Sequence, residues 1–317
     1  MKSGLLLTAA TAAVLLAGMG SARAAWDFTT VSDPAGVSTV ASGINDAGVV
    51  VGSYIDGGGN SNGFSLTGAT YATVDVPGAA MTTASGINNA GVITGYYEDN
   101  SGGVHGFTQT GITPASFDAT NAITGGATYG SATNGGGTTV GYYFDSGLAK
   151  HGFSATAGNY TTLDVTGLGS VVSTQALGVN AAGTIVGSYS DGTENHGFVD
   201  VGGVYTAVNA RLGAKGTVVT SIDSVGDLGG YYIDGGGTTH GFVDVDGTFY
   251  TVDDPNAGTV TEILGFNNVG QVAGYYVDNS GGVFGFTADV PEPGTLAMFG
   301  LAALGMMGLR RRRSFGF

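Results

Sequence analysis

SGINNAGVITGYYEDNSGGVHGF, residues 85–107, occurs in recognisable form six times along this chain of 317 residues. Each copy contains an Asn-x-x-Gly turn, a strand similar to Val-Gly-Tyr-Tyr, an aspartate, a polar loop and a Gly-Phe pair. The turn position is occupied by Asn45, Asn88, Asn134, Asn180, Asp223 and Asn267, and the phenylalanine position by Phe64, Phe107, Phe153, Phe198, Phe242 and Phe286. Neighbouring copies are 43 to 46 residues apart, so the chain repeats one supersecondary unit.

Each copy has room for four β-strands. In the second copy the strand-like stretches are 82–88, 92–99, 105–109 and 115–118, and Gly, Asn and Asp separate them. Six such units predict an all-β fold, a six-bladed β-propeller of four-stranded blades. The repeats lie near 38–80, 81–122, 123–168, 169–213, 214–258 and 259–289. The small residues of 38–45, 82–88 and 173–180 suit the innermost strand around a narrow channel.

The two ends of the repeat region complement each other. The sixth copy stops after Phe286 without a fourth strand, whereas residues 26–34, before the first copy, resemble the fourth-strand segment 72–77. We therefore expect the N-terminal strand to complete the last blade and close the ring, which hides the edges that an open array exposes. An open β-solenoid is the alternative fold, but it does not explain the complementary ends.

Composition indicates a packed, acidic body without disulfides. The chain has 61 glycines and no cysteine, 10% of its residues are charged and 42% are hydrophobic, so packing must supply the stability. Between residues 25 and 289 the bases are Lys150, Arg211 and Lys215, against 23 acids, which gives a charge of about −20. Such a surface repels nucleic acid and other anionic polymers, so we expect no nucleic-acid partner.

Aspartate and histidine recur at fixed positions of the repeat. An aspartate ends the second strand of every copy, and all four histidines directly precede a Gly-Phe pair. These candidate ligand residues are Asp56, Asp99, His105, Asp145, His151, Asp191, His196, Asp234, His240 and Asp278. Strand alternation places them at the end of the ring opposite the Asn-x-x-Gly turns, together with the connections that follow the fourth strands.

The aspartate and histidine of one copy are five or six residues apart across a short loop, so we expect them to be a cross-strand pair. We interpret the pair as a hydrogen bond that fixes each hairpin, because catalytic sites rarely repeat six-fold. The alternative is a divalent-cation site, for which carboxylates and loop carbonyls suit Ca²⁺ and imidazoles suit transition metals. No loop has EF-hand spacing, so we expect no cofactor, with Ca²⁺ the ion to test, and no catalytic residue.

The first 24 residues are predicted to be a secretory signal peptide. Lys2 provides a basic start, residues 5–16 form an apolar run, and Ala22-Arg23-Ala24 is a small-x-small cleavage site. The body would therefore leave the cytoplasm.

The C-terminus contains a second candidate targeting segment. Val290, Pro291, Glu292 and Pro293 are followed by an uncharged apolar run over 295–309 and by arginines at 310–313. The run of 15 residues is short for a stable span, and the arginines would hold its end in the cytoplasm. This order resembles the PEP-CTERM sorting tail of Gram-negative bacteria. The resemblance covers only residues 290–317, and it implies a transient inner-membrane anchor that exosortase processes near Pro-Glu-Pro. A simple C-terminal anchor is the alternative.

The body resembles bacterial extracellular proteins with repeats of the HAF type, through segments such as 85–88 and 105–107. Together these patterns favour an exported repeat protein of the cell surface or extracellular matrix, a binding or structural module. Its expected partners are exosortase, the export machinery and an exopolysaccharide of a biofilm.

Two other functions stay open: a secreted propeller enzyme that acts on glycans or phosphoesters, and a cation-dependent adhesin. We favour a protein that is not an enzyme. The chain has no cysteine, and no Ser/His/Asp set or carboxylate pair stands apart from its repeats.

Overall fold

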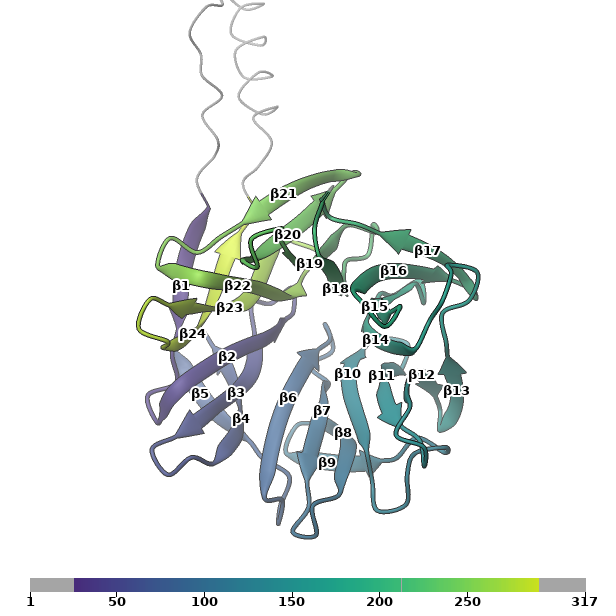
Figure 1. The fold of residues 1–317 in the computed structure, drawn as a ribbon. Helices are drawn as coiled ribbons and strands as arrows, with labels where there is room; N and C mark the ends of the chain where they lie inside the picture. The colour runs from purple at the N-terminus through teal and green to yellow at the C-terminus, as the bar shows by residue number, and fades with distance from the viewer. Residues whose placement is uncertain (1–25, 212, 291–317) are drawn as a thin grey trace, which may run out of the picture. The chain divides into compact units, whose positions relative to one another are not determined.

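The computed structural model describes residues 26–211 and 213–290, and this part of the chain contains 24 β-strands and no helix. The strands form six antiparallel four-stranded blades around a central axis (Figure 1). The predicted six-bladed β-propeller is therefore confirmed in preference to the open solenoid. The predicted signal peptide 1–24, Pro291 to Pro293, the apolar run 295–309 and the arginines 310–313 lie outside the described residues.

The blades are numbered 1 to 6, and in blades 1 to 5 the strands follow chain order from the axis outward. The first, innermost strands are β2 (Gly36–Ile44), β6 (Met81–Ile87), β10 (Thr128–Thr133), β14 (Ser173–Val179), β18 (Gly216–Ile222) and β22 (Ala257–Phe266). The second strands are β3 (Val50–Asp56), β7 (Ile93–Glu98), β11 (Thr138–Phe144), β15 (Ile185–Ser190), β19 (Leu228–Ile233) and β23 (Gln271–Asp278). The third strands are β4 (Ser61–Thr67), β8 (Val104–Thr110), β12 (Lys150–Thr156), β16 (Asn195–Val201), β20 (Thr239–Val245) and β24 (Val283–Asp289). The fourth, outermost strands are β5 (Thr70–Val74), β9 (Thr113–Phe117), β13 (Asn159–Leu163), β17 (Val204–Val208), β21 (Thr248–Val252) and, in blade 6, β1 (Asp27–Val31).

Two parallel bridges link neighbouring blades. Thr239 pairs with Val260, which joins β20 to β22 and makes blades 5 and 6 one continuous sheet. Val104 of β8 forms an isolated bridge with Ala127, just before β10.

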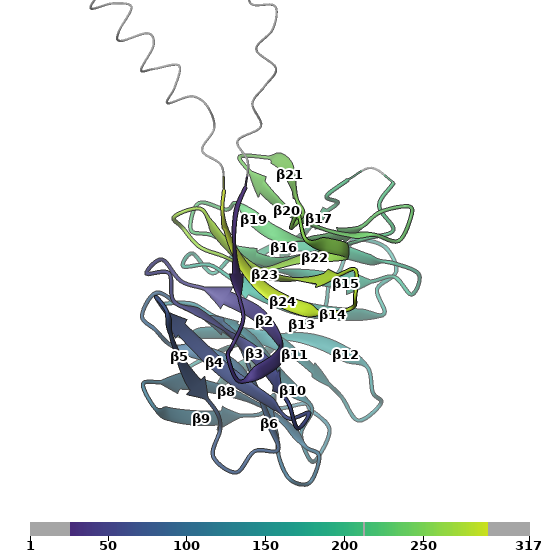
Figure 2. The same cartoon turned by 90° about the vertical axis from the view of Figure 1, so that its left-hand side faces the viewer.

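The N-terminal strand closes the ring. β1 pairs in antiparallel register with β24, from Asp27 opposite Asp289 through Val31, and Figure 2 shows it running beside β24. Val31 is buried, and Phe28 packs edge-to-face on Phe286 with the ring centroids 5.3 Å apart. Blade 6 is therefore built from both ends of the body, as the complementary ends predicted.

The repeated Gly and Phe form the core between blades. The six phenylalanines are at most 1% exposed. Phe107 packs with Ala84 of its own blade and Val51 of blade 1, so one apolar cluster spans two blades. A Cβ at Gly95, in the Val-Gly-Tyr-Tyr strand, would overlap the carbonyl oxygen of Thr83 and press on the Phe107 ring. Glycine is required there, which explains why the pattern recurs in every copy.

The turn asparagines connect each blade to the next. In every turn the side-chain Oδ1 accepts hydrogen bonds from the N–H groups two and four residues later, as Asn45 does from Ala47 and Val49. The asparagine Nδ2 donates to the backbone carbonyl of the equivalent turn residue in the following blade. These bonds are Asn45 to Asn88 (3.2 Å), Asn88 to Asn134 (3.0 Å), Asn134 to Asn180 (2.9 Å), Asn180 to Asp223 (3.1 Å) and Asn267 to Asn45 (2.9 Å). We call this set the asparagine ring.

The junction between blades 5 and 6 is the exception, because the carboxylate of Asp223 has no N–H to donate to the turn of blade 6. Its Oδ1 still accepts from the backbone of its own turn. Two other bonds cross this junction: Thr220 Oγ1 donates to the carbonyl of Ile263 (2.8 Å), and the Ser224 N–H donates to Oδ1 of Asn268 (2.7 Å). The Ser224 bond has counterparts at two junctions that keep the asparagine bond, from the Asp46 N–H to Asn89 and from the Asn268 N–H to Asp46. Among the described residues, only the Thr220 bond is particular to this junction.

Deleting residues 27–34 should destabilise the whole ring, because it exposes the edge of β24 and the apolar surface that Phe28 and Val31 cover. We expect the free energy of unfolding to fall by about 3–6 kcal/mol, measured by urea denaturation. Val31→Ala, which keeps the strand but removes buried methyl groups, should lose less, about 1–3 kcal/mol. An unchanged unfolding midpoint after the deletion would contradict closure by β1.

Asn134→Asp should weaken one blade junction, because it keeps the Oδ1 acceptor but places a carboxylate opposite the buried carbonyl of Asn180. The expected loss in the free energy of unfolding is about 1–3 kcal/mol. The reverse change, Asp223→Asn, supplies the missing donor and should stabilise the protein by up to about 1 kcal/mol. If chemical denaturation finds both variants equal to the parent protein, the asparagine ring does not hold the blades together.

Candidate functional site

A cavity of about 230 Å³ lies on the axis at the asparagine end of the ring. The ends of the six innermost strands line it, and Ser42, Ser85 and Ser131 are among the lining residues. The carboxylate of Asp46 accepts hydrogen bonds from Nδ2 of Asn89 (2.6 Å) and of Asn268 (2.8 Å). The small side chains that the sequence predicted for the innermost strands are thus found around the axis.

At the opposite end of the ring, each predicted aspartate closes the loop between the second and third strands. Asp99 Oδ1 accepts hydrogen bonds from the N–H groups of Gly103 (2.9 Å) and Ser101 (2.7 Å). These bonds, with that from Gly103 foremost, hold the pKa of Asp99 below its usual value. Hydrogen bonds from their own loops likewise lower the pKa of Asp56, Asp145, Asp191, Asp234 and Asp278. The six aspartates are therefore loop-closing groups.

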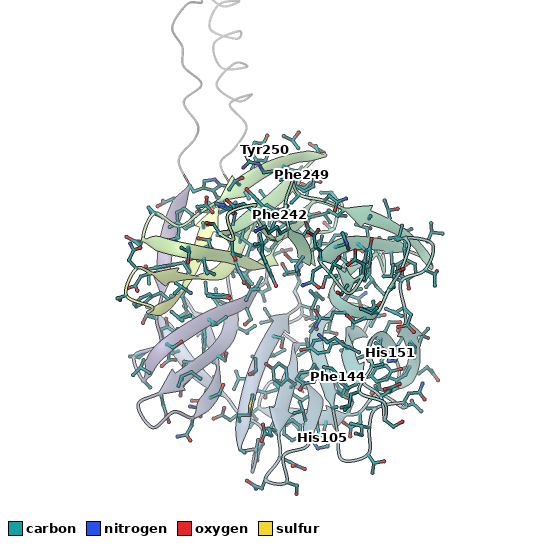
Figure 3. All side chains as sticks on the ribbon, in the orientation of Figure 1. His105, Phe144, His151, Phe242, Phe249 and Tyr250 are labelled. Atoms are coloured by element: carbon teal, nitrogen blue, oxygen red, sulfur yellow. The ribbon has the colours of Figure 1, made fainter. Side chains whose placement is uncertain are left out.

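Each histidine lies on the third strand beside its loop aspartate. In blades 2, 3 and 5 the imidazole has a carboxylate on both ring nitrogens. The distances from Nε2 to the loop aspartate are 3.4 Å for His105 and Asp99, 3.5 Å for His151 and Asp145, and 3.5 Å for His240 and Asp234. The distances from Nδ1 to an aspartate that follows the fourth strand are 2.9 Å for His105 and Asp118, 2.8 Å for His151 and Asp164, and 3.0 Å for His240 and Asp253. We call each set an Asp-His-Asp bridge; Figure 3 labels His105 and His151 in adjacent blades.

The strand register differs from the predicted one. His105 is opposite Tyr97, and the two rings lie 5.3 Å apart. Asp99 is in the loop, where its N–H donates to the carbonyl of Gly103, and only its side chain reaches the imidazole. The predicted contact between aspartate and histidine is present, but the prediction that they are cross-strand partners is wrong, because the loop closes two residues before His105.

The aspartates after the fourth strands were missed by the sequence analysis. Asp118, Asp164 and Asp253 each follow a fourth strand directly, and this repeated position was the available signal. Burial lowers the pKa of His105, but the hydrogen bond and charge of Asp118, with a smaller effect of Asp99, raise it above the usual value overall. The imidazole of His105 is thus stabilised in its protonated form.

The Asp-His-Asp bridges do not have the geometry of a metal centre. Their two carboxylates face opposite nitrogens of one imidazole, so the three groups cannot converge on a single ion. Within residues 26–211 and 213–290, no group of three His, Cys, Asp or Glu side chains could hold a metal ion. At His105 both carboxylates are thus bonded to one imidazole, which is the contact expected of groups that fix the hairpin.

Blade 4 departs from the pattern at the same end of the ring. His196 Nε2 is 3.1 Å from Oδ2 of Asp191, the shortest of the four loop contacts. Its fourth strand is followed by Asn209 in place of an aspartate, and among the described residues His196 Nδ1 has no hydrogen-bond partner. A pocket of about 180 Å³ lies beside it, between blades 4 and 5. Its lining residues are Glu194, Asn195, His196, Asn209, Arg211, Gly213, Ala214, Gly216 and Thr217.

Comparison with known proteins identifies the C-terminal segment. Residues 289–313 match the PEP-CTERM protein-sorting motif. This motif marks an exported protein that exosortase recognises and that is processed at the membrane, as predicted from the order of motif, apolar run and arginines. Among the described residues, no helix has the length and apolar character needed to cross a membrane. No curated protein matches the chain.

Several solved structures resemble the body. A mutant of the Aleuria aurantia lectin in complex with Fucα1-6GlcNAc is 13% identical over 79% of this chain and 91% of its own, with a TM-score of 0.49. AofleA from Arthrobotrys oligospora is 12% identical over 84% of both chains, with a TM-score of 0.47. A gluconolactonase of Xanthomonas campestris is 11% identical over 84% of this chain and 90% of its own, with a TM-score of 0.49. At this identity the likeness concerns the fold, and the number of blades follows from the strand pairing itself.

The bridge at His105 should make stability depend on pH. A raised pKa in the folded state stabilises the protein below the ordinary histidine pKa of about 6.5, and this contribution is lost as pH rises through the folded pKa. The melting temperature of the parent protein should therefore exceed that of His105→Gln by more at pH 5.5 than at pH 8.5. We expect a change of about 1–2 °C, since half-exposed ion pairs are screened by water. Asp118→Asn should show the same pH dependence. A difference in melting temperature between the parent protein and the variants that stays constant with pH would show that the bridge is uncharged.

Proposed function

We propose that the mature protein is an exported binding module that holds extracellular polysaccharide, at the cell surface or in the matrix of a biofilm. One observation carries this proposal: the ring is complete where the sorting motif begins. The Val290 N–H donates to the carbonyl of Gly270 (2.7 Å), and Pro291 follows directly. Processing near Pro-Glu-Pro would release a ring that retains all six blades and its closing strand.

The Asp and His end of the ring supports binding better than chemistry. Its loop aspartates accept hydrogen bonds from their own loops, and three of its four histidines have a carboxylate on each ring nitrogen. Groups that are held in this way give six rigid loops on one face, and such a face suits recognition. A secreted glycan or phosphoester enzyme would need an acid, base or nucleophile that its neighbours leave free to react.

The charge of the body bears on the kind of partner. With about −20 charges between residues 25 and 289, the protein repels anionic polymers at low salt. A neutral polysaccharide meets no such barrier, and its hydroxyl groups match a polar surface. The resemblance to HAF-type extracellular proteins agrees with this placement and stays a prediction.

The cation-dependent adhesin has less support. A cation at a loop aspartate would compete with the backbone N–H groups that already bind the carboxylate, as at Asp278, whose Oδ1 accepts from Ser280 and Gly282. The binding experiment can separate the two hypotheses directly.

Polysaccharide purified from the medium of the producing cells should bind the immobilised ring, residues 25–290, in biolayer interferometry. We expect binding that survives excess EDTA and changes little with ionic strength, because neither a bridging cation nor charge attraction contributes. Heat-denatured protein on a parallel sensor is the control. Binding that disappears in EDTA and returns with Ca²⁺ would favour the adhesin, and no binding under either condition would refute the proposal.

A further inference from the structure

We infer that the pocket between blades 4 and 5 binds one neutral sugar unit at a chain end or side branch of a polysaccharide. This inference rests on the proposed function and names its binding site. Three departures from the repeat meet at this pocket: a loop one residue shorter between Asp191 and His196, Asn209 where blades 2, 3 and 5 have aspartate, and Arg211. Positions that differ at one place in a repeated ring are those that the common architecture does not require.

Arg211 gives the pocket a donor that the other blades do not have. The equivalent position two residues after the end-of-strand aspartate is held by Pro77, Thr120, Thr166 and Pro255 in blades 1, 2, 3 and 5. The guanidinium Nη1 of Arg211 lies 3.4 Å from the hydroxyl of Tyr232 in blade 5, which orients it across the blade junction. Its remaining N–H groups can donate to a pair of adjacent hydroxyl oxygens.

His196 supplies a matching acceptor. Its Nε2 contacts the Asp191 carboxylate at 3.1 Å, so Nε2 carries the proton in the neutral imidazole and Nδ1 keeps its lone pair. In blades 2, 3 and 5 the same nitrogen contacts the aspartate that follows the fourth strand. In blade 4 that sequence position is Asn209, and His196 and Asn209 both line the pocket. The pocket thus combines N–H donors with a nitrogen and a carboxylate, that of Glu194, as acceptors. Sugar hydroxyl groups both donate and accept, so they can satisfy this mixed set.

Charge favours a neutral sugar over an acidic one. Glu194 is in the pocket, Asp191 contacts His196, and Asp234 attracts Arg211 from the neighbouring blade. These carboxylates offset the guanidinium, so a uronate would meet local repulsion as well as the acidic body.

The size of the pocket sets how much of a polymer it can hold. A volume of about 180 Å³ is below the ~300–1,000 Å³ of pockets that take drug-sized ligands, so one sugar ring is the fitting occupant. A pocket for one ring accepts a terminal or branching residue, whereas an internal stretch of a chain needs an open groove.

The test uses residues 25–290, the closed ring, with glucose, galactose, mannose and glucuronic acid as free ligands and as inhibitors of polysaccharide binding. We expect a neutral hexose to bind in the millimolar range by isothermal titration calorimetry and to inhibit polymer binding better than glucuronic acid. Arg211→Ala should weaken both effects about tenfold or more, since it removes charged donors.

Asn209→Asp is the sharper variant, because it rebuilds in blade 4 the Asp-His-Asp bridge that already folds in three other blades. It should occupy His196 Nδ1, keep or raise the melting temperature, and weaken sugar binding about tenfold. Asp118→Asn is the matched control: it opens His105 in blade 2 in the same way, where no arginine is present, and should leave sugar binding unchanged.

The outcomes separate the two proposals. If the parent protein, Arg211→Ala and Asn209→Asp bind the polymer equally, this pocket is not the binding site, although the proposed function still holds. If glucuronic acid inhibits polymer binding more strongly than every hexose does, the inference that the ligand is a neutral sugar is wrong. If the parent protein binds no polysaccharide, both proposals fail together.

Discussion

In five of the six blades one side chain, the turn asparagine, satisfies its own turn and the neighbouring turn at the same time. Its carbonyl oxygen accepts from the backbone of its own loop, and its amide donates to the backbone of the next blade, as Asn134 does to Asn180 at 2.9 Å. A carboxylate can do only the first, and a hydroxyl is too short to span both. Because the bond is buried, either half left unmade would cost free energy, so turn geometry and blade spacing are coupled around the axis.

Much of the fold could be predicted because each blade meets the same local demands. Gly95 leaves room for the carbonyl of Thr83 and the ring of Phe107, so its recurrence reports a contact inside one blade. Residues 26–34 could be placed because their sequence resembles that of a fourth strand, which the last copy lacks. The bond from each asparagine to the next blade was not visible in the sequence, since it depends on how two blades stand relative to each other.

The candidate site was predicted less completely, for a related reason. Asp99 and His105 were identified, but the loop closure at Gly103 shifts the register and makes Tyr97 the strand partner. A small slip of register changes every pairing on a strand, and in a hairpin the geometry of the turn sets the register. The spacing of Asp99 and His105 did not reveal where this turn closes. Asp118 lies 13 residues from His105, and only the return of the fourth strand brings the two together. The pocket of blade 4 needed the comparison among blades, because Asn209 is notable only where its counterparts are aspartates.

The pairing of the first strand with the last also sets an order of events for folding. β1 is the first strand of the ring to be synthesised and β24 is the last, so their contact closes the longest loop in the body. Local hairpins and neighbouring blades can form as the chain emerges, whereas a contact of such high sequence separation is entropically costly and comes late. Until then the growing molecule is an arc with two unpaired edges, open to pairing with another copy. A ring that is synthesised from its N-terminus is therefore kept incomplete by its own topology until β24 is made, and the pairing of β24 with β1 is the step that removes these open edges.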